Sequence, residues 1–154
     1  MSSGRTGIFV ATMTGLASIC AEEIQAALAD AGIACEILLM DDLDADALDG
    51  FDTVVIVSST YGHGDIPDNG QGFFEALAGG GSLAGKTYTV FALGDRTYMD
   101  TFCHAGEKWD ALFADKGAAR FAPLERHDAS SGTLAEDEAG AWAASWTARL
   151  KLAA

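Results

Sequence analysis

Short hydrophobic runs alternate with longer amphipathic stretches along the whole chain. The runs are rich in apolar and β-branched residues and end at glycine or polar turn residues, which is typical of strands buried on both faces of a sheet. The stretches between them carry apolar side chains at every third or fourth position, which favours helices with one buried face. The predicted strands are residues 8–12, 34–39, 53–58, 88–93 and 120–125, and the predicted helices are residues 19–31, 72–78, 107–116 and 134–152.

This alternation predicts an α/β fold in a single domain spanning residues 1–154. Because helices separate the successive strands, we expect the strands to run parallel and the helices to cover both faces of the sheet. Such sheets bind their ligands outside the carboxyl ends of the strands. The candidate site therefore lies in the loops after the first, third and fourth predicted strands, residues 12–18, 59–69 and 94–106.

Charge and composition exclude several classes of function. A formal net charge of −14 argues against a nucleic-acid binder and against an anionic membrane surface as a partner, because both interactions need clustered Lys and Arg. No apolar run approaches the roughly 20 residues of a membrane span, and no signal-peptide core precedes the first strand. We therefore expect a cytoplasmic protein without membrane or nucleic-acid partners.

Cysteines and aspartates give no sign of a metal site. Cys20, Cys35 and Cys103 form no CxxC pair, so we expect three reduced thiols, with Cys20 and Cys35 buried as small apolar residues. Aspartates gather in residues 41–52, but this stretch lacks the Gly and Glu that a calcium loop needs at fixed positions. We interpret it as a solvated loop.

The first loop has the composition of an anion site. It joins a buried strand to a helix, and it offers the hydroxyls of Thr12, Thr14 and Ser18 together with the small backbone of Gly15. Unpaired N–H groups at the start of a helix bind phosphate well. The loop has no Lys and lacks the P-loop spacing, which argues against nucleotide hydrolysis. An ordinary helix cap of Thr and Ser is the alternative, and the residues of this loop alone leave both possibilities open.

The other two loops each place a tyrosine just beyond a strand. Tyr61 follows the third predicted strand and Tyr98 follows the fourth. Two aromatic rings from neighbouring loops suggest stacking on a planar ring system, although simple packing would explain either ring by itself. Gly62 and Gly64 flank His63 and give the backbone of the second loop unusual freedom.

These loops, taken in order, resemble those of the flavodoxins. The similar stretches are residues 12–17, 59–69 and 92–106, and the likeness extends over about residues 6–150. Among flavodoxins the chain looks most like the short-chain MioC-type members and like the FMN modules of diflavin reductases. The resemblance implies a three-layer α/β/α sandwich around a five-stranded parallel sheet with strand order 2-1-3-4-5. The fifth strand runs directly into the last helix, which leaves no room for the insertion of long-chain flavodoxins.

By this resemblance the chain binds FMN without a covalent bond and has no catalytic side chain. Thr12, Thr14 and Ala17, with the backbone N–H groups between them, would hold the phosphate, and Tyr61 and Tyr98 would lie on opposite faces of the isoalloxazine ring. Backbone groups of the second and third loops would contact the ring edge. The candidate cofactor-binding residues are Thr12, Met13, Thr14, Gly15, Leu16, Ala17, Ser59, Thr60, Tyr61, Gly62, His63, Gly64, Leu93, Gly94, Asp95, Tyr98, Phe102, Cys103 and Asp128.

The function implied by the resemblance is electron transfer by a monomer. FMN would cycle between oxidised, semiquinone and hydroquinone forms and would carry single electrons from an NADP-dependent flavodoxin/ferredoxin reductase to an unknown acceptor enzyme. The carbonyl of Gly62 would turn toward flavin N5 when N5 gains a proton. The acidic surface would steer the carrier toward basic faces of its partners.

Two other functions are compatible with such a sheet. The first is an FMN-dependent NAD(P)H:quinone-type oxidoreductase, which needs an open flavin face that Tyr61 and Tyr98 would block. The second is a response regulator, which needs acidic residues after the first strand and an aspartate after the third. This chain has Thr12 and Met13 at the first of those places and Ser59 and Thr60 at the second.

The sequence departs from the flavodoxin pattern at three positions. Leu16 stands where family members often have Asn or a hydroxyl residue, and Ser18 and His63 each replace a frequent Glu. A Glu beside the ring would place negative charge near the anionic hydroquinone, whereas His63 adds none when neutral and a favourable charge when protonated. A histidine that points to solvent and has no role is the alternative.

Replacing His63 by Glu should therefore lower the semiquinone/hydroquinone potential. Each ~1.4 kcal/mol of altered charge interaction corresponds to about 59 mV for a one-electron couple. Anaerobic redox titration of the two proteins measures the difference, and equal potentials would show that the charge of His63 does not act on the flavin.

Overall fold

The computed structural model describes residues 5–12, 15–41, 43–60, 66–94 and 103–153, with the backbone alone for residues 148–153. The strands in this part of the chain are β1 (Thr6–Ala11), β2 (Cys35–Leu39), β3 (Thr53–Ser58), β4 (Thr87–Gly94), β5 (Ala119–Arg120) and β6 (Glu125–Asp128). The α-helices are α1 (Leu16–Asp30), α2 (Asp68–Ala78), α3 (His104–Asp115) and α4 (Ala135–Ala153). Two short 3₁₀ helices, η1 (Ala45–Leu48) and η3 (Ala129–Ser131), lie between them.

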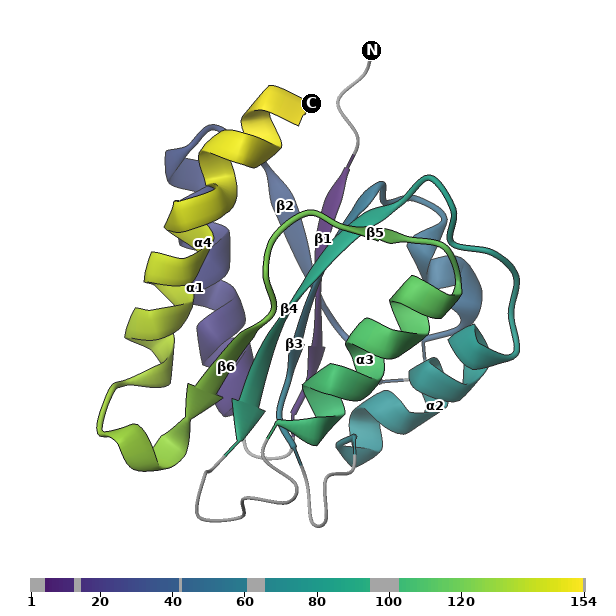
Figure 1. The fold of residues 1–154 in the computed structure, drawn as a ribbon, viewed down its shortest axis with the longest axis horizontal. Coiled ribbons are helices and arrows are strands. Elements are labelled where there is room, and N and C mark those ends of the chain that lie inside the picture. The colour runs from purple at the N-terminus through teal and green to yellow at the C-terminus, as the bar shows by residue number, and fades with distance from the viewer. Residues whose placement is uncertain (1–4, 13–14, 42, 61–65, 95–102, 154) are drawn as a thin grey trace.

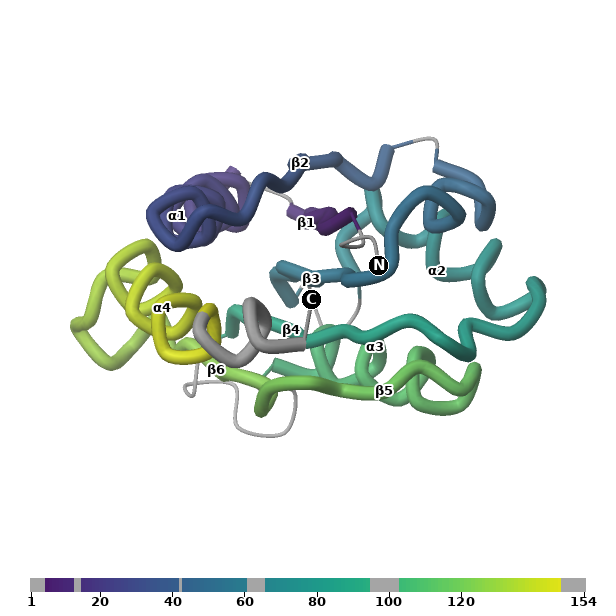
Figure 2. Tube along the Cα trace, turned by 90° about the horizontal axis from the view of Figure 1, so that it is seen from above, coloured from purple at the N-terminus to yellow at the C-terminus, as the bar shows by residue number. Residues whose placement is uncertain are grey.

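The strands form one parallel sheet between two layers of helices. The order across the sheet is β2-β1-β3-β4-β5, and β6 also pairs with β4. Helices α1 and α4 cover one face, and α2 and α3 cover the other (Figure 1, Figure 2). The predicted three-layer fold and its strand order are therefore confirmed.

Two hydrophobic cores lie on the two faces of the sheet, because successive residues of a strand point in opposite directions. In β1, Ile8 and Val10 belong to the core beneath α1 and α4, whereas Phe9 and Ala11 belong to the core beneath α2 and α3. Every residue of β1 and of β3 is buried. This double burial explains why the central strands are continuous hydrophobic runs.

The predicted fifth strand over residues 120–125 is divided in two. Ala119–Arg120 forms β5 and Glu125–Asp128 forms β6, and both pair with the same edge of β4. Pro123 lies between them and has no backbone N–H to donate, so it interrupts the ladder. The second segment extends farther than predicted and places Asp128 beside Gly94, at the end of β4.

Three smaller expectations also change. The three helices that follow β1, β3 and β4 begin three or four residues earlier than predicted, at Leu16, Asp68 and His104. The aspartate-rich stretch is not wholly a solvated loop, because η1 lies within it and buries the side chain of Leu48. Cys20 is buried as expected, whereas Cys35 is only half-buried, since β2 is an edge strand.

Helix α3 approaches the sheet closely at Gly106. A Cβ atom at this position would lie 2.3 Å from Cβ of Ala92 in β4 and 3.2 Å from its Cα atom. Glycine is needed here for close approach, because the neighbouring atoms belong to the backbone and first carbon of a central strand. The contact brings the beginning of α3 against the end of β4.

We expect Gly106→Ala to destabilise the protein by about 1–3 kcal/mol, because overpacking at a tight contact forces the backbone to move. Gly72→Ala is the matched control: Gly72 is an exposed helical glycine, and a methyl group added to it would have nothing within 4 Å. It should gain roughly 0.5–1 kcal/mol from the lower flexibility of alanine. Urea unfolding of both variants measures the difference, and equal effects would contradict the close contact.

Candidate functional site at the carboxyl edge

Helices α1, α2 and α3 begin at the carboxyl edge of the sheet, the edge at which β1, β3 and β4 end (Figure 1). Their N-cap residues are Gly15 for α1, Pro67 for α2 and Cys103 for α3, and none of the three makes a side-chain capping bond. The first N–H groups of a helix have no partner within the helix, and this end of the helix dipole is positive. Helix α1 has no acidic residue in its first turn, so its start favours an anion.

The first loop is shaped by two hydrogen bonds of Thr12. The N–H of Gly15 donates to Thr12 Oγ1 at 2.9 Å, and the N–H of Thr12 donates to Asn69 Oδ1 at 2.9 Å. Gly15 has φ 91°, a left-handed conformation that glycine adopts without strain. Because Thr12 Oγ1 accepts the Gly15 bond, the proton of the Thr12 hydroxyl remains available for another acceptor.

Leu16 and Ala17 contribute little side-chain chemistry to this edge. Leu16 packs against the core beneath α1 and α4, and Ala17 is fully buried in that core. Leu16 therefore serves packing. The backbone N–H groups of both residues lie in the first turn of α1, so they belong to the group that a helix leaves without internal partners.

A buried hydroxyl just beyond the end of β3 has no hydrogen-bond partner among the described residues. Within the described residues, Thr60 Oγ1 is one of two buried side-chain polar atoms without a partner; the other is Trp146 Nε1, in α4. The backbone before Thr60 is firmly held: the N–H of Ser59 donates to Ala11 O at 2.9 Å, and Trp109 Nε1 donates to Ser58 Oγ at 3.2 Å. A buried polar group without a partner costs about 1–3 kcal/mol, which points to an acceptor or donor supplied by a ligand.

The ends of β4 and β6 are joined through Cys103. Its thiol lies 3.6 Å from Ala92 O and 3.7 Å from His127 O, and its φ of 57° is unusual for a residue with a side chain. The inward position of the thiol fixes the start of α3 against both strands. Asp128, at the end of β6, accepts hydrogen bonds from the N–H of Ser130 at 2.9 Å and from its hydroxyl at 2.7 Å.

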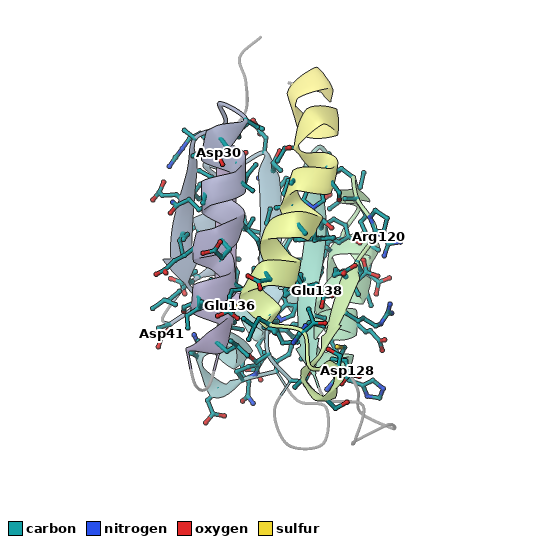
Figure 3. All side chains as sticks on the ribbon, turned by 90° about the vertical axis from the view of Figure 1, so that its left-hand side faces the viewer. Asp30, Asp41, Arg120, Asp128, Glu136 and Glu138 are labelled. Carbon is teal, nitrogen blue, oxygen red and sulfur yellow. The ribbon has the colours of Figure 1, made fainter. Side chains whose placement is uncertain are left out.

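A cluster of acidic groups and one imidazole lies beneath the start of α4. His127 is 3% exposed, and its Nδ1 lies 2.7 Å from Glu138 Oε1. Burial, together with a hydrogen bond to Glu138 and the negative charge of Glu138, raises the pKa of Glu125 to about 7. Figure 3 views this face, with Glu136 and Glu138 at the start of α4 and Asp128 at the end of β6. The bond to Glu138 gives Nδ1 of the buried imidazole a partner.

Cys20 lies near the same acidic groups, and its surroundings disfavour ionisation of the thiol. Burial first, and then the charges of Glu136, Glu138 and Glu23, raise the pKa of the Cys20 thiol to about 12. A thiol with such a pKa is almost wholly protonated at neutral pH. The described part of the chain has no group of three or more His, Cys, Asp or Glu placed to hold a metal ion, and none of its helices is long and apolar enough to cross a membrane.

About half of the sequence-predicted site lies outside the described residues. The structure brings Thr12, Gly15, Leu16, Ala17, Ser59, Thr60, Leu93, Gly94, Cys103 and Asp128 to the carboxyl edge or to its margin. The expected tyrosine pair, Tyr61 and Tyr98, lies outside the described residues. The predicted residues outside the described part are Met13, Thr14, Tyr61, Gly62, His63, Gly64, Asp95, Tyr98 and Phe102.

Sequence reasoning did not single out Asn69, which the structure places beside the first loop. It stands at the end of the second loop, where its type gives only a general turn signal, and its bond to Thr12 joins residues 57 positions apart. It also missed the pairing of Glu125 with Glu138, because a charged pair far apart in sequence gives no local pattern.

The chain is similar to flavodoxins in sequence and in structure. A family model described as Flavodoxin matches residues 8–142. Flavodoxin YqcA of Escherichia coli (strain K12) is 35% identical over 142 residues, which are 91% of this chain and 94% of the relative. Protein MioC of Escherichia coli (strain K12) is 34% identical over 141 residues, which are 89% of this chain and 92% of that protein. The solved structure of a mutant of flavodoxin from Pseudomonas aeruginosa has a TM-score of 0.86 and 32% identity, and the match covers 96% and 99% of the two chains.

The expected likeness to diflavin reductases is also confirmed. The flavoprotein alpha-component of NADPH sulfite reductase from Aliivibrio fischeri (strain ATCC 700601 / ES114) is 36% identical over 128 residues. The match covers 82% of this chain but 21% of that protein, so the similarity concerns one part of the larger reductase.

The Glu125–Glu138 pair predicts a pH-dependent stability. The pKa of Glu125 rises from its usual 4.5 to about 7, so the folded chain keeps a proton that the unfolded chain releases. This group therefore lowers the free energy of unfolding progressively as pH rises from about 4.5 to about 7. We expect Glu125→Gln, which keeps an uncharged donor to Glu138, to match the wild-type melting temperature near pH 4.5 and to exceed it above pH 7.

Glu22→Gln removes one exposed charge elsewhere on the chain and is the control for net charge. Melting temperatures of the three proteins between pH 4.5 and 8 test the prediction. A gain from Glu125→Gln that is the same at every pH, or that Glu22→Gln reproduces, would contradict a raised pKa of Glu125.

Proposed function

The chain belongs to the flavodoxin family, and we propose that it is a single-electron carrier that holds FMN at the carboxyl edge of its sheet. FMN is the cofactor of this family. When bound, it would supply a centre that can accept and donate single electrons. The protein's own task is to bind the cofactor, to set its potentials and to present it to partners.

One observation carries the proposal: the buried hydroxyl of Thr60, which has no partner among the described residues. It lies two residues beyond the end of β3, the strand beside β1 in the sheet, and β1 leads to the start of α1, which has no side-chain cap. A phosphate ester with several acceptor oxygens suits both features, because it can accept from hydroxyls and from helix N–H groups together. The residues present therefore fit FMN at its phosphate end.

The first loop supports the same assignment. The bond between the N–H of Gly15 and Thr12 Oγ1 closes the loop, and the hydroxyl proton of Thr12 is left to donate. We assign phosphate binding to Thr12, Thr14 and Thr60 and to the backbone of Met13, Gly15, Leu16 and Ala17. Preformed geometry of this kind reduces the entropy that binding costs.

The ring site is assigned to the second and third loops. Tyr61 and Tyr98 are proposed to lie on opposite faces of the isoalloxazine ring, where they would shield it from a second substrate. We propose that backbone groups of Leu93 and Gly94, at the end of β4, and of Cys103, at the start of α3, contact the ring edge. The thiol of Cys103 is turned toward the sheet, which supports a backbone contact by this residue. The remaining proposed contacts of this site are Ser59, Gly62, His63, Gly64, Asp95, Phe102 and Asp128.

The proposed partners follow from charge. A net charge of −14 would favour docking on basic faces and would make association fall as salt rises. We propose an NADP-dependent flavodoxin/ferredoxin reductase as electron donor and a redox enzyme of unknown identity as acceptor, with the carrier acting as a monomer. The match to one part of a sulfite reductase flavoprotein supports the choice of an NADP-dependent donor. The name of that relative includes NADPH, and the part similar to this chain belongs to the same polypeptide.

We expect the apoprotein to bind one FMN and to accumulate a semiquinone during stepwise anaerobic reduction with dithionite. NADPH alone should leave the flavin oxidised, because the chain is proposed to lack an open nicotinamide site. Visible spectra recorded through the titration measure both results. Failure to bind FMN would refute the proposal, and rapid bleaching by NADPH without a semiquinone would indicate a two-electron reductase instead.

Thr60→Val tests the observation on which the proposal depends. The substitution keeps the shape of the side chain and removes a buried hydroxyl that has no partner among the described residues. We expect a more stable apoprotein, by about 1 kcal/mol, and FMN binding weakened about tenfold, because the lost hydroxyl would bond the phosphate only in the complex.

Thr87→Val is the matched control for this experiment. Thr87 begins β4 at the opposite end of the sheet, where its hydroxyl lies 3.3 Å from that of Thr53. It should lose stability without losing FMN affinity. Unchanged FMN affinity in Thr60→Val would remove Thr60 from the proposed site.

A further inference from the structure

Asn69, in the first turn of α2, connects three segments that are far apart in the sequence. Its Oδ1 accepts the N–H of Thr12 at 2.9 Å. Its Nδ2 donates to Val10 O, near the end of β1, at 3.4 Å and to Asp41 Oδ1, just after β2, at 3.0 Å. One side chain therefore joins the start of the first loop to the last residues of β1 and to the connection that follows β2.

A carboxamide is the side chain that meets these demands. The backbone N–H of Thr12 needs an acceptor, whereas the carbonyl of Val10 and the carboxylate of Asp41 need a donor. An aspartate at position 69 would place a second carboxylate against Asp41, and an aliphatic residue would leave the N–H of Thr12 without a partner. The three bonds also fix which atom of the amide is oxygen and which is nitrogen.

The approach of α2 to the end of β1 depends on Gly70. A Cβ atom at Gly70 would lie 2.9 Å from Cβ of Ala11 and 3.2 Å from Sδ of Met40. Because glycine leaves this space free, the first turn of α2 lies directly beside β1, and the side chain of Asn69 reaches the first loop. The N–H of Gly70 donates to Pro67 O at 2.8 Å and so closes the turn at the start of the helix.

The bond of Asn69 determines where the first loop begins. It holds the backbone of Thr12, and Thr12 Oγ1 in turn accepts the N–H of Gly15, the N-cap of α1. A chain of two hydrogen bonds thus runs from the start of α2 to the start of α1. Without Asn69, the N–H of Thr12 would lose its acceptor, while the sheet beneath would keep its own ladder bonds.

We propose that Asn69 is a positioning residue for the phosphate end of the FMN site. It holds Thr12 and the Gly15 turn in the binding arrangement before the cofactor arrives, and it contributes nothing to recognition of the isoalloxazine ring. The inference rests on the proposed function, because it concerns the same site. It adds that a change of this one amide should weaken binding of the phosphate and leave binding of the ring unchanged.

The test compares FMN with riboflavin, which has the same ring and lacks the phosphate. Apoprotein is titrated with each flavin, and quenching of flavin fluorescence gives the two dissociation constants. For Asn69→Leu we expect FMN to bind about tenfold more weakly and riboflavin to bind within about twofold of the wild-type value. Inorganic phosphate, which raises the melting temperature of an apoprotein with an intact phosphate site, should raise that of Asn69→Leu less.

Gln25→Leu is the matched control, because it removes another side-chain amide that bonds a backbone carbonyl. Gln25 Nε2 donates to Cys35 O at 3.1 Å, between α1 and β2 and away from the first loop. Its affinities for both flavins should equal those of the wild type. Asn69→Asp is a second variant of nearly identical shape. It keeps an acceptor for the N–H of Thr12 but loses both donor bonds and places a carboxylate against Asp41, so it should also weaken FMN more than riboflavin.

The outcomes separate the two proposals. A wild-type apoprotein that binds neither flavin overturns the proposed function and this inference with it. A wild type that binds FMN, combined with Asn69 variants that lose both flavins equally or lose neither, overturns the inference alone. Circular dichroism of each apoprotein identifies a variant that has not folded, and the comparison then depends on Asn69→Asp.

Discussion

The site depends on the separation of β1 and β3. The two strands are hydrogen-bonded neighbours up to the bond between the N–H of Ser59 and Ala11 O, and beyond it the chain leaves toward opposite faces of the sheet. The loop after β1 leads to α1 on one face, and the loop after β3 leads to α2 on the other. A crevice at such a point is a general property of doubly wound sheets. The hydroxyl of Thr60, which has no partner in the described part of the chain, lies at this separation.

Contacts between small residues bring the helices close to the strand ends. Gly70 of α2 lies against Ala11 of β1, and Gly106 of α3 lies against Ala92 of β4. In both cases a glycine near the start of a helix meets an alanine near the end of a strand. The polar side chains next to these contacts, Asn69 and Cys103, can then reach backbone groups of the strand ends. The close packing therefore places Asn69 and Cys103 within reach of their hydrogen-bond acceptors at the strand ends.

The sequence predicted the architecture well because burial on both faces leaves a strong local signal. Residues 53–58 were predicted as a strand with the same bounds that β3 has. The division of the fifth strand at Pro123 was missed because a short edge strand carries little pattern. The bonds of Asn69 and the pair formed by Glu125 and Glu138 could not be predicted, since each joins residues that only the folded topology brings together. The expected roles of Tyr61 and Tyr98 rest on their positions after two neighbouring strands and on the resemblance, and both residues lie outside the described part of the chain.

The position of Glu125 affects how the last helix joins the rest of the fold. Helix α4 lies against the sheet with Glu138 between Glu125 and the imidazole of His127, and Glu125 keeps its proton up to about pH 7. Because the pKa of Glu125 is raised, we expect docking of α4 to be linked to proton uptake by this one carboxyl group between about pH 4.5 and 7. The heat measured on unfolding must then include the ionisation enthalpy of that buffer, so calorimetry in two buffers of different ionisation enthalpy would count the proton.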